Sequence, residues 1–318
     1  MTKKKQAQYS GIGGQAVLEG VMMKNKTKYA VAVRKPDGDI DVQVEDYKGV
    51  CGDMGFVKFP LVRGVFTFID SLVLGMRVTM HSASFYEEEE QAAAEETVKE
   101  TSNGKADDIM MGVTVAVSVV IAVGLFMLLP FLLSDLLGKY IRNASLVAIL
   151  EGVLRILIFV GYIVAISLMK DIKRLYMYHG AEHKCINCIE RGRPLTVKNF
   201  MRSSRQHKRC GTSFLLFVVL VSVIIFFFIR VDNMVLKLAL RLLLIPVIAG
   251  ISYEIIRLAG RSNNILIRII SAPGMWMQRL TTKEPDEDMV EVAIASVEAV
   301  FDWRAYLEET FGYDADDL

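Results

Sequence analysis

The chain has 318 residues, a formal net charge of +1 at pH 7 and four cysteines. A hydrophobic fraction of 53% and a mean hydropathy of +0.36, with the apolar residues grouped in blocks, exclude a set of ordinary soluble domains. The net charge by itself indicates no partner. Residues 1–58 contain no apolar run typical of a secretory signal, so we expect the cysteines to be free or metal-bound rather than disulfide-paired.

Residues 1–58 predict a small β-rich cytoplasmic region. Lys28–Val33 and Ile40–Val44 alternate apolar and polar residues and flank the turn-forming segment Pro36–Asp39, which is typical of a hairpin. The glycines of Gly11–Gly14 predict a turn. A phosphate-binding loop is the alternative there, although no Lys-Ser/Thr pair follows at the required spacing.

Residues 59–86 predict a helix with charges on one face. Arg63, Asp70 and Arg77 are seven residues apart, nearly two helical turns, and apolar residues cover the rest of the surface. We expect an amphipathic interfacial helix, with a re-entrant segment as the alternative. Residues 87–110, which begin with four glutamates, predict an acidic connector.

Residues 111–256 predict a transmembrane core of four spanning helices. A bilayer core of about 30 Å requires roughly 20 apolar helical residues. Four stretches approach this requirement: Met111–Leu133, Leu146–Met169, Ser213–Ile229 and Leu238–Ile256. The predicted fold class is therefore a mainly α membrane protein, a four-helix transmembrane bundle with a small β-containing N-terminal region.

The basic residues predict the orientation of this core. Loop 170–212 contains eleven Lys or Arg against three acidic residues, whereas each of the other two connections has two basic residues. The loop is therefore expected in the cytoplasm, where it would attract anionic lipid. An even number of spans puts both termini of this inner-membrane protein there too.

Residues 257–318 predict a cytoplasmic tail. Arg257–Arg279 is basic and amphipathic and is expected at the membrane surface, with a break at Pro273 and Gly274. The last part, from Lys283, contains twelve acidic residues, and Met289–Trp303 predicts a helix that could dock on the β-rich region.

The strongest candidate chemistry lies in the central loop. His179 and His183 are four residues apart and share one helical face, and His207 and Cys210 precede the third span. One hypothesis is an inverted zincin-type site for zinc or another divalent metal, with the histidines as ligands and Glu182 as the catalytic base.

Two alternatives stay open for the same segment. Cys185-x-x-Cys188 and His207-x-x-Cys210 have the spacing of a structural zinc site. The other is that these groups hold no metal and only form hydrogen bonds or contact lipid headgroups beside a basic loop.

Four charged residues in the predicted spans are further candidates. Glu151 and Arg155 are four residues apart and can pair along one helix, and Glu254 and Arg257 repeat the arrangement near the end of the fourth span. Ionisable groups inside a membrane are commonly functional; those at its edge also serve as anchors.

Several separated motifs together resemble the YqhQ-like family of bacterial membrane proteins, over essentially the whole chain. The motifs are Gly13–Met23, His179–Lys184, Arg209–Ser213, Leu280–Pro285 and Val290–Ile294. The resemblance implies an integral membrane protein of a kind sometimes described as a metal-dependent enzyme. It does not extend to the paired cysteines, which favours a site at His179, Glu182, His183, His207 and Cys210.

The residues leave the function open between a membrane-embedded metalloprotein, a hydrolase among them, and a non-enzymatic scaffold for membrane-protein or translocation machinery. A small-solute transporter is a third hypothesis, although no inverted repeat is visible. The expected partners are the lipid bilayer, a second copy of the chain or another membrane protein. Nothing in the sequence predicts a specific nucleic-acid partner.

Overall fold

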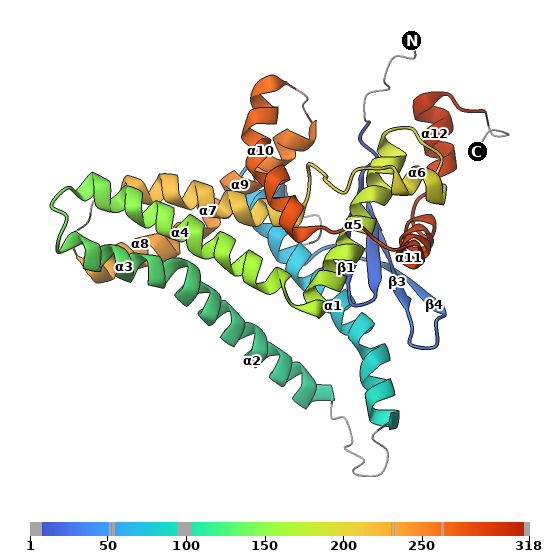
Figure 1. Ribbon diagram of the computed structural model, residues 1–318, viewed down its shortest axis with the longest axis horizontal. Helices are drawn as coiled ribbons and strands as arrows, with labels where there is room; N and C mark the ends of the chain where they lie inside the picture. The colour runs from blue at the N-terminus through green and yellow to red at the C-terminus, as the bar shows by residue number, and fades with distance from the viewer. Residues whose placement is uncertain are drawn as a thin grey trace. The chain divides into compact units, whose positions relative to one another are not determined.

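The computed structural model describes residues 8–50, 52, 55–93, 104–229, 231, 233–261 and 264–314. It is mainly helical, with one antiparallel sheet near the N-terminus (Figure 1). The chain divides into two compact units. Unit 1 comprises residues 1–89, 166–217 and 249–318, and unit 2 comprises residues 90–165 and 218–248.

Unit 1 contains a four-stranded meander in the order β1-β2-β3-β4. The strands are β1 (Ile12–Val17), β2 (Gly20–Asn25), β3 (Lys28–Arg34) and β4 (Ile40–Asp46). The predicted hairpin is confirmed, with Arg34 opposite Ile40 and a glycine in the left-handed region, Gly38, in its turn. The turn predicted at Gly11–Gly14 is wrong, because Gly14 pairs with Met23 inside β1.

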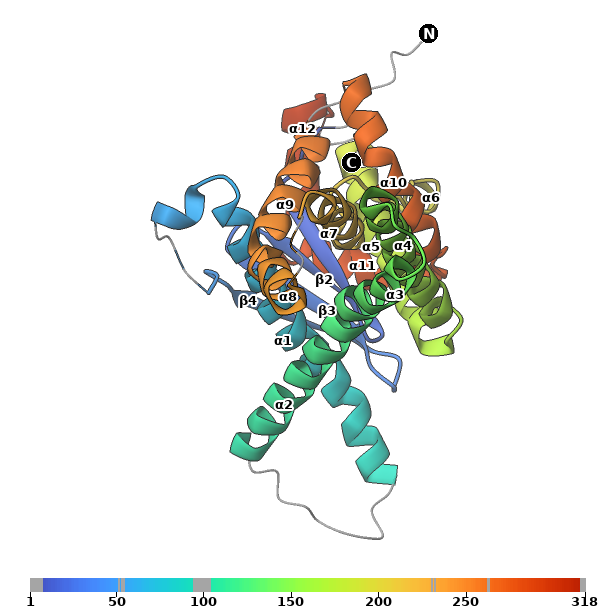
Figure 2. The ribbon, with the colours of Figure 1, turned by 90° about the vertical axis from the view of Figure 1, so that its left-hand side faces the viewer.

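Helices cover both faces of this sheet (Figure 2). Successive strand residues point to opposite faces, so Val21 and Met23 pack on one side and Met22 on the other. The helices of unit 1 that do not extend into unit 2 are α5 (Lys170–Glu190), α6 (Val197–Met201), α10 (Ile265–Thr281), α11 (Glu287–Glu298) and α12 (Trp303–Phe311). A short 3-10 helix, η1 (Gly55–Lys58), precedes α1.

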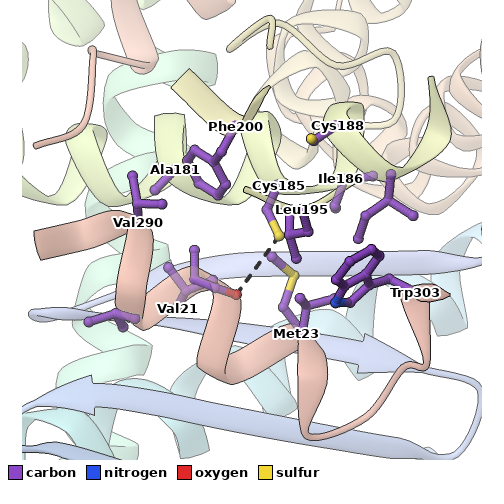
Figure 3. Packing of buried hydrophobic residues seen from close by; sticks show 14 of the residues in the cluster. Val21, Met23, Ala181, Cys185, Ile186, Cys188, Leu195, Phe200, Val290 and Trp303 are labelled. Carbon is purple, nitrogen blue, oxygen red and sulfur yellow. Dashed lines mark hydrogen bonds between the residues drawn. The ribbon is translucent and has the colours of Figure 1, made fainter. Parts of the chain in front are cut away.

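The larger core lies between the sheet, α5 and α11 (Figure 3). Cys185 of α5 points its sulfur toward the carbonyl of Ala293 on α11, and Met23 of the sheet packs beside Trp303. The C-terminal part of the chain therefore packs on the β-rich region. It does so as two helices, because α11 ends at Glu298 and α12 begins at Trp303, where a single helix over Met289–Trp303 was expected.

The opposite face of the sheet packs against α1 (Val62–Ala93). Leu74 and Val78 of this helix are buried among apolar strand residues, while Leu72 and Met80 remain exposed. The sheet thus accounts for part of the apolar surface of α1. The membrane contact expected for residues 59–86 stays a prediction.

Unit 2 consists of apolar helices. They include α2 (Gly104–Val123), a π-helical turn η2 (Gly124–Leu128), α3 (Leu129–Gly138), α4 (Ala144–Ser167) and α8 (Met234–Leu243). Helices α7 (Gly211–Phe227) and α9 (Ile245–Arg261) have residues in both units. The π turn precedes Pro130, a residue that lacks a backbone N–H and disturbs the regular helical ladder.

Two helical segments of the described residues are long and apolar enough to cross a membrane, Gly112–Gly138 and Ala144–Ser167. A third crossing results if α8 and α9, which are bent by 41°, form one span. The third predicted span corresponds to α7, which is apolar but has only 17 residues. Membrane association therefore rests on two to three helices, rather than on a clear four-helix bundle.

A core substitution tests the packing of α11. We expect Met289→Ala to lower the free energy of unfolding by about 2–5 kcal/mol, because this fully buried side chain would leave a cavity. Glu291→Ala is the matched control on the same helix. Its exposed ion pair with Arg34 is worth less than about 1 kcal/mol. Thermal unfolding in mild detergent measures both, and equal midpoints would contradict the packing.

Candidate metal centre

Helix α5 carries most of the candidate ligands. His179 and His183 follow one another by one turn on the same face, so their rings lie 4.4 Å apart between centroids. The loop after α6 returns to this face and brings Cys210 against the two rings. Nδ1 or Nε2 of each histidine and Sγ of Cys210 all lie within 4.8 Å of one another. The sequence-predicted ligands His179, His183 and Cys210 therefore converge.

Backbone carbonyls orient both imidazoles. Nδ1 of His179 is 2.8 Å from the carbonyl oxygen of Thr281, and Nδ1 of His183 is 2.6 Å from that of Arg205. A carbonyl oxygen can only accept, so both Nδ1 atoms carry a proton, and Nε2 is the atom with a lone pair when each imidazole is neutral. Metal-bound histidines in proteins are commonly fixed by this kind of hydrogen bond.

The separation of the atoms suits a metal. Nε2 of His179 lies 3.2 Å from Sγ of Cys210. Two such ligands on tetrahedral zinc would be about 3.6 Å apart, given the usual Zn–N and Zn–S bond lengths. A shift of a few tenths of an ångström would thus place these two atoms at ligand distance.

Two polar side chains of α5 hold the loop that supplies Arg205. The ammonium group of Lys184, which is buried, donates to the carbonyl oxygens of Met201 and Ser203 at 2.6 and 3.1 Å. The amide of Asn187 donates to the carbonyl of Ser204 at 2.7 Å. The loop carbonyl facing His183 is therefore positioned by α5 itself.

A glycine in α5 makes room for the segment that contains Thr281. The chain leaving α10 crosses α5 at Gly180, where an added Cβ would lie 1.9 Å from the carbonyl oxygen of Lys283. The amide of Lys283 also donates to the carbonyl of Tyr176 at 2.8 Å. Only glycine permits this approach. Sequence reasoning missed this role, although Gly180 stands inside the histidine motif.

Charge favours the thiolate form of Cys210. Burial acts to raise the pKa of this thiol, but the imidazoles of His179 and His183 outweigh it, and the pKa falls well below its ordinary value. Burial acts to lower the pKa of His183, but Cys210 and Glu182 raise it to about 9. The thiolate is the form of cysteine that binds metals.

Glu182 lies beside the three converging groups. Its Oε2 is 3.4 Å from Nε2 of His183, and the side chain is almost completely buried. Gly14 of β1 packs against it: an added Cβ there would lie 2.6 Å from Cγ of Glu182 and 2.9 Å from the carbonyl oxygen of Met22. The glycine-rich strand thus closes the site, a second role that the sequence did not indicate.

His207 points elsewhere. Its Nε2 lies 3.4 Å from one carboxylate oxygen of Glu190. The other oxygen of Glu190 accepts hydrogen bonds from Arg209 at 2.5 Å and from the Ser10 hydroxyl at 2.9 Å. Burial acts to raise the pKa of Glu190, but His207 and Arg209 outweigh it and lower the pKa to about 2. The structure therefore places His207 in an adjoining ion network, with Gln278 bound to its backbone.

The paired cysteines lie apart from the three ligands. Cys185 Sγ is directed at the carbonyl of Ala293, and Cys188 Sγ faces the carbonyl of Pro194, so the two sulfurs diverge (Figure 3). Burial raises the pKa of both thiols, that of Cys188 to about 11. The structure does not bring them to His207 and Cys210, as the zinc-ribbon hypothesis required.

The charged candidates Glu151 and Arg155 belong to a buried cluster in unit 2. Glu151 accepts two hydrogen bonds from Arg241, at 2.6 and 2.9 Å, and one from Arg155 at 2.8 Å. Ser134 and Ser222 complete the polar contacts of the cluster. One carboxylate thus compensates two guanidinium groups, all three at most 5% exposed.

Glu254 and Arg257 are part of a second ion network, in unit 1. Glu254 binds Arg63 of α1 through two hydrogen bonds and lies 3.8 Å from Arg257. Asp70 of α1 accepts from the amide of Val50 at 2.6 Å. The periodic charges of α1 therefore anchor neighbouring segments.

The comparisons with known proteins agree with the resemblance seen in the sequence. Residues 59–303 match the family described as a protein of unknown function, DUF1385. The chain is 35% identical over 301 residues to the uncharacterized protein YqhQ of Bacillus subtilis strain 168, covering 93% of this chain and 94% of that protein. No solved structure matches the chain.

A pair of glycine substitutions tests the closure of the site by β1. We expect Gly14→Ala to lower the thermal midpoint, because the new methyl group would collide with Glu182 and with the backbone of Met22. Gly13→Ala is the matched control, since an added Cβ at Gly13 meets nothing within 4 Å. Two variants of equal stability would show that β1 does not press on Glu182.

A neutral substitution tests the buried cluster of unit 2. Glu151→Gln should lower the free energy of unfolding by about 3–5 kcal/mol, because it leaves two buried guanidinium groups without a carboxylate. Asp135→Asn, at an exposed position of α3, should change it little. Thermal denaturation in detergent measures both, and an unchanged midpoint for Glu151→Gln would refute the assignment.

Proposed function

The chain belongs to the DUF1385 family of proteins of unknown function, and we propose that it is a membrane-embedded zinc-dependent hydrolase. The observation that carries the proposal is the convergence of His179, His183 and Cys210 within 4.8 Å. The Nε2 atoms would be the metal-binding atoms, because both Nδ1 atoms donate to carbonyls. Metal binding would displace the proton that a pKa of about 9 keeps on His183, and two neutral imidazoles with a thiolate form a donor set that zinc prefers.

The donor set favours a catalytic over a structural centre. Structural zinc sites are closed by four protein ligands, whereas three protein ligands leave a position for water or substrate. Zinc held in this way supplies Lewis-acid chemistry, because it polarises a carbonyl or phosphoryl oxygen and acidifies water.

The residues around the three ligands fit a hydrolytic role. The carboxylate of Glu182 would accept the proton of the attacking water and pass it to the leaving group. The Thr212 hydroxyl lies 3.1 Å from Sγ of Cys210 and would donate to the thiolate, which would stabilise its negative charge. His179 is the most exposed of the three ligands, so a substrate would approach from its side.

We also propose four membrane crossings, with the termini and residues 170–212 in the cytoplasm of a bacterial inner membrane. The eleven basic residues of that loop support this orientation. Helix α7, with 17 residues, is about 26 Å long, a few ångströms short of a typical hydrocarbon core. Such a mismatch is tolerated at modest cost by local thinning of the bilayer.

Metal analysis of the detergent-purified full chain tests the zinc proposal. We expect about one zinc ion per chain in the wild type, in keeping with one set of three ligands. His183→Ala and Cys210→Ser should lose it, whereas Glu182→Gln should keep the metal and lose any hydrolytic activity. Inductively coupled plasma mass spectrometry gives the occupancy.

Two variants serve as matched controls. His207→Gln and Cys188→Ala alter groups that the structure places outside the three ligands, so both should retain the metal. Loss of metal in His207→Gln alone would move the centre toward the Glu190 network. A wild-type protein without stoichiometric zinc, iron or manganese would refute the proposal and favour the scaffold hypothesis.

A further inference from the structure

Helix α10 combines basic charge with an absence of acidic residues. The segment 257–282 contains four arginines and no Asp or Glu. The helix begins at Ile265, shortly after α9, the second half of the bent apolar pair that can form one membrane span. The segment at the end of this candidate span therefore carries only positive charges.

One face of α10 is apolar and exposed. Ile265, Ile269 and Trp276 are 64%, 62% and 53% exposed, and they share a face because residues 4 and 11 positions apart align on a helix. Leu266 and Ile270, which are 62% and 42% exposed, lie about 100° further around the helix. Large apolar groups in such a continuous row are uncommon on a surface that only meets water.

Arginines line one edge of this apolar face. Arg268 and Arg279 are exposed, and their spacing of 11 residues places them on one line along α10, while Arg261, also exposed, ends α9. The opposite face of α10 is buried and contains Ser271, Gly274 and Gln278. Charge, apolar residues and core contacts thus occupy three separate sectors.

We propose that α10 lies in the surface of an anionic bilayer, with its apolar row among the acyl chains and its arginines at the lipid phosphates. This partition into an apolar face that contains a tryptophan and a basic edge is that of interfacial membrane helices. Each basic residue adds attraction to anionic lipid. A protein partner would instead need acidic groups placed opposite an open arginine row.

The buried face of the same helix contacts the segments around the candidate metal centre. The side chain of Gln278 donates to the carbonyl of His207 at 2.7 Å, and the carbonyl of Thr281 accepts from His179. The centre would therefore lie about one helix diameter, ~10 Å, from the lipid headgroups. The membrane proposal itself does not depend on a bound metal.

Tryptophan fluorescence can test this placement, because the chain has only two tryptophans. Trp303 is 3% exposed, so the accessible emission belongs to Trp276. The full chain is reconstituted in vesicles of phosphatidylcholine with or without phosphatidylglycerol, and brominated lipid is the quencher. We expect quenching and a blue-shifted emission, both stronger with phosphatidylglycerol.

Variants identify the source of the signal. Trp276→Phe should abolish the quenchable component and leave the emission of buried Trp303. The double variant Arg268→Gln, Arg279→Gln should reduce quenching in anionic vesicles at low salt, where charges are least screened.

Three results would overturn the proposal. Quenching of Trp276 by aqueous acrylamide but not by brominated lipid would place the helix in water. Protection from both quenchers would mean that protein covers the face. Equal quenching with and without phosphatidylglycerol would remove the role of anionic lipid. None of these results bears on zinc content, so the two proposals fail separately.

Discussion

The organisation of unit 1 depends on a backbone crossing at Gly180. The absence of a side chain there lets the segment after α10 lie directly on α5, and this contact delivers the Thr281 carbonyl to His179. The same helix holds the loop of Arg205 through Lys184 and Asn187. Both imidazoles are therefore oriented by carbonyls from segments far from α5 in sequence.

Because these groups are buried, their hydrogen bonds must be made within the protein. Helix α5 is packed between the sheet, α11 and the segment that follows α5. Every residue from Gly180 to Glu190 is buried. A buried polar group without a partner costs about 1–3 kcal/mol. The polar residues of this stretch must consequently be paired, which explains why its lysine, asparagine and glutamates all bind loop backbone, histidine or arginine.

The sequence predicted the parts of this protein that obey local rules. The β3–β4 hairpin followed from alternation and a turn signal, and the family followed from separated motifs. The 4-residue spacing of His179 and His183 correctly placed both on one face of α5. Hydropathy indicated membrane helices, of which two to three meet the length and composition requirements.

The remainder depended on contacts between distant segments, which no local pattern encodes. The roles of Gly14 and Gly180 come from Glu182 and Lys283 approaching through space. The predicted pairing of Glu151 with Arg155 in the same helix is confirmed, yet Arg241, ninety residues away, makes the bidentate contact. Likewise His207 shares the motif region with Cys210, but Glu190 determines where its ring points.

Unit 1 is assembled from three separate stretches of the chain, which are synthesised at different times. Strand β1 emerges from the ribosome first, α5 in the middle and Thr281 only near the end. Domains usually fold as their residues become available during translation. Here the apolar helices of unit 2 are synthesised before Thr281 reaches His179. Membrane insertion would therefore precede completion of the candidate centre, so a chain truncated before α10 could enter the bilayer but could not orient His179.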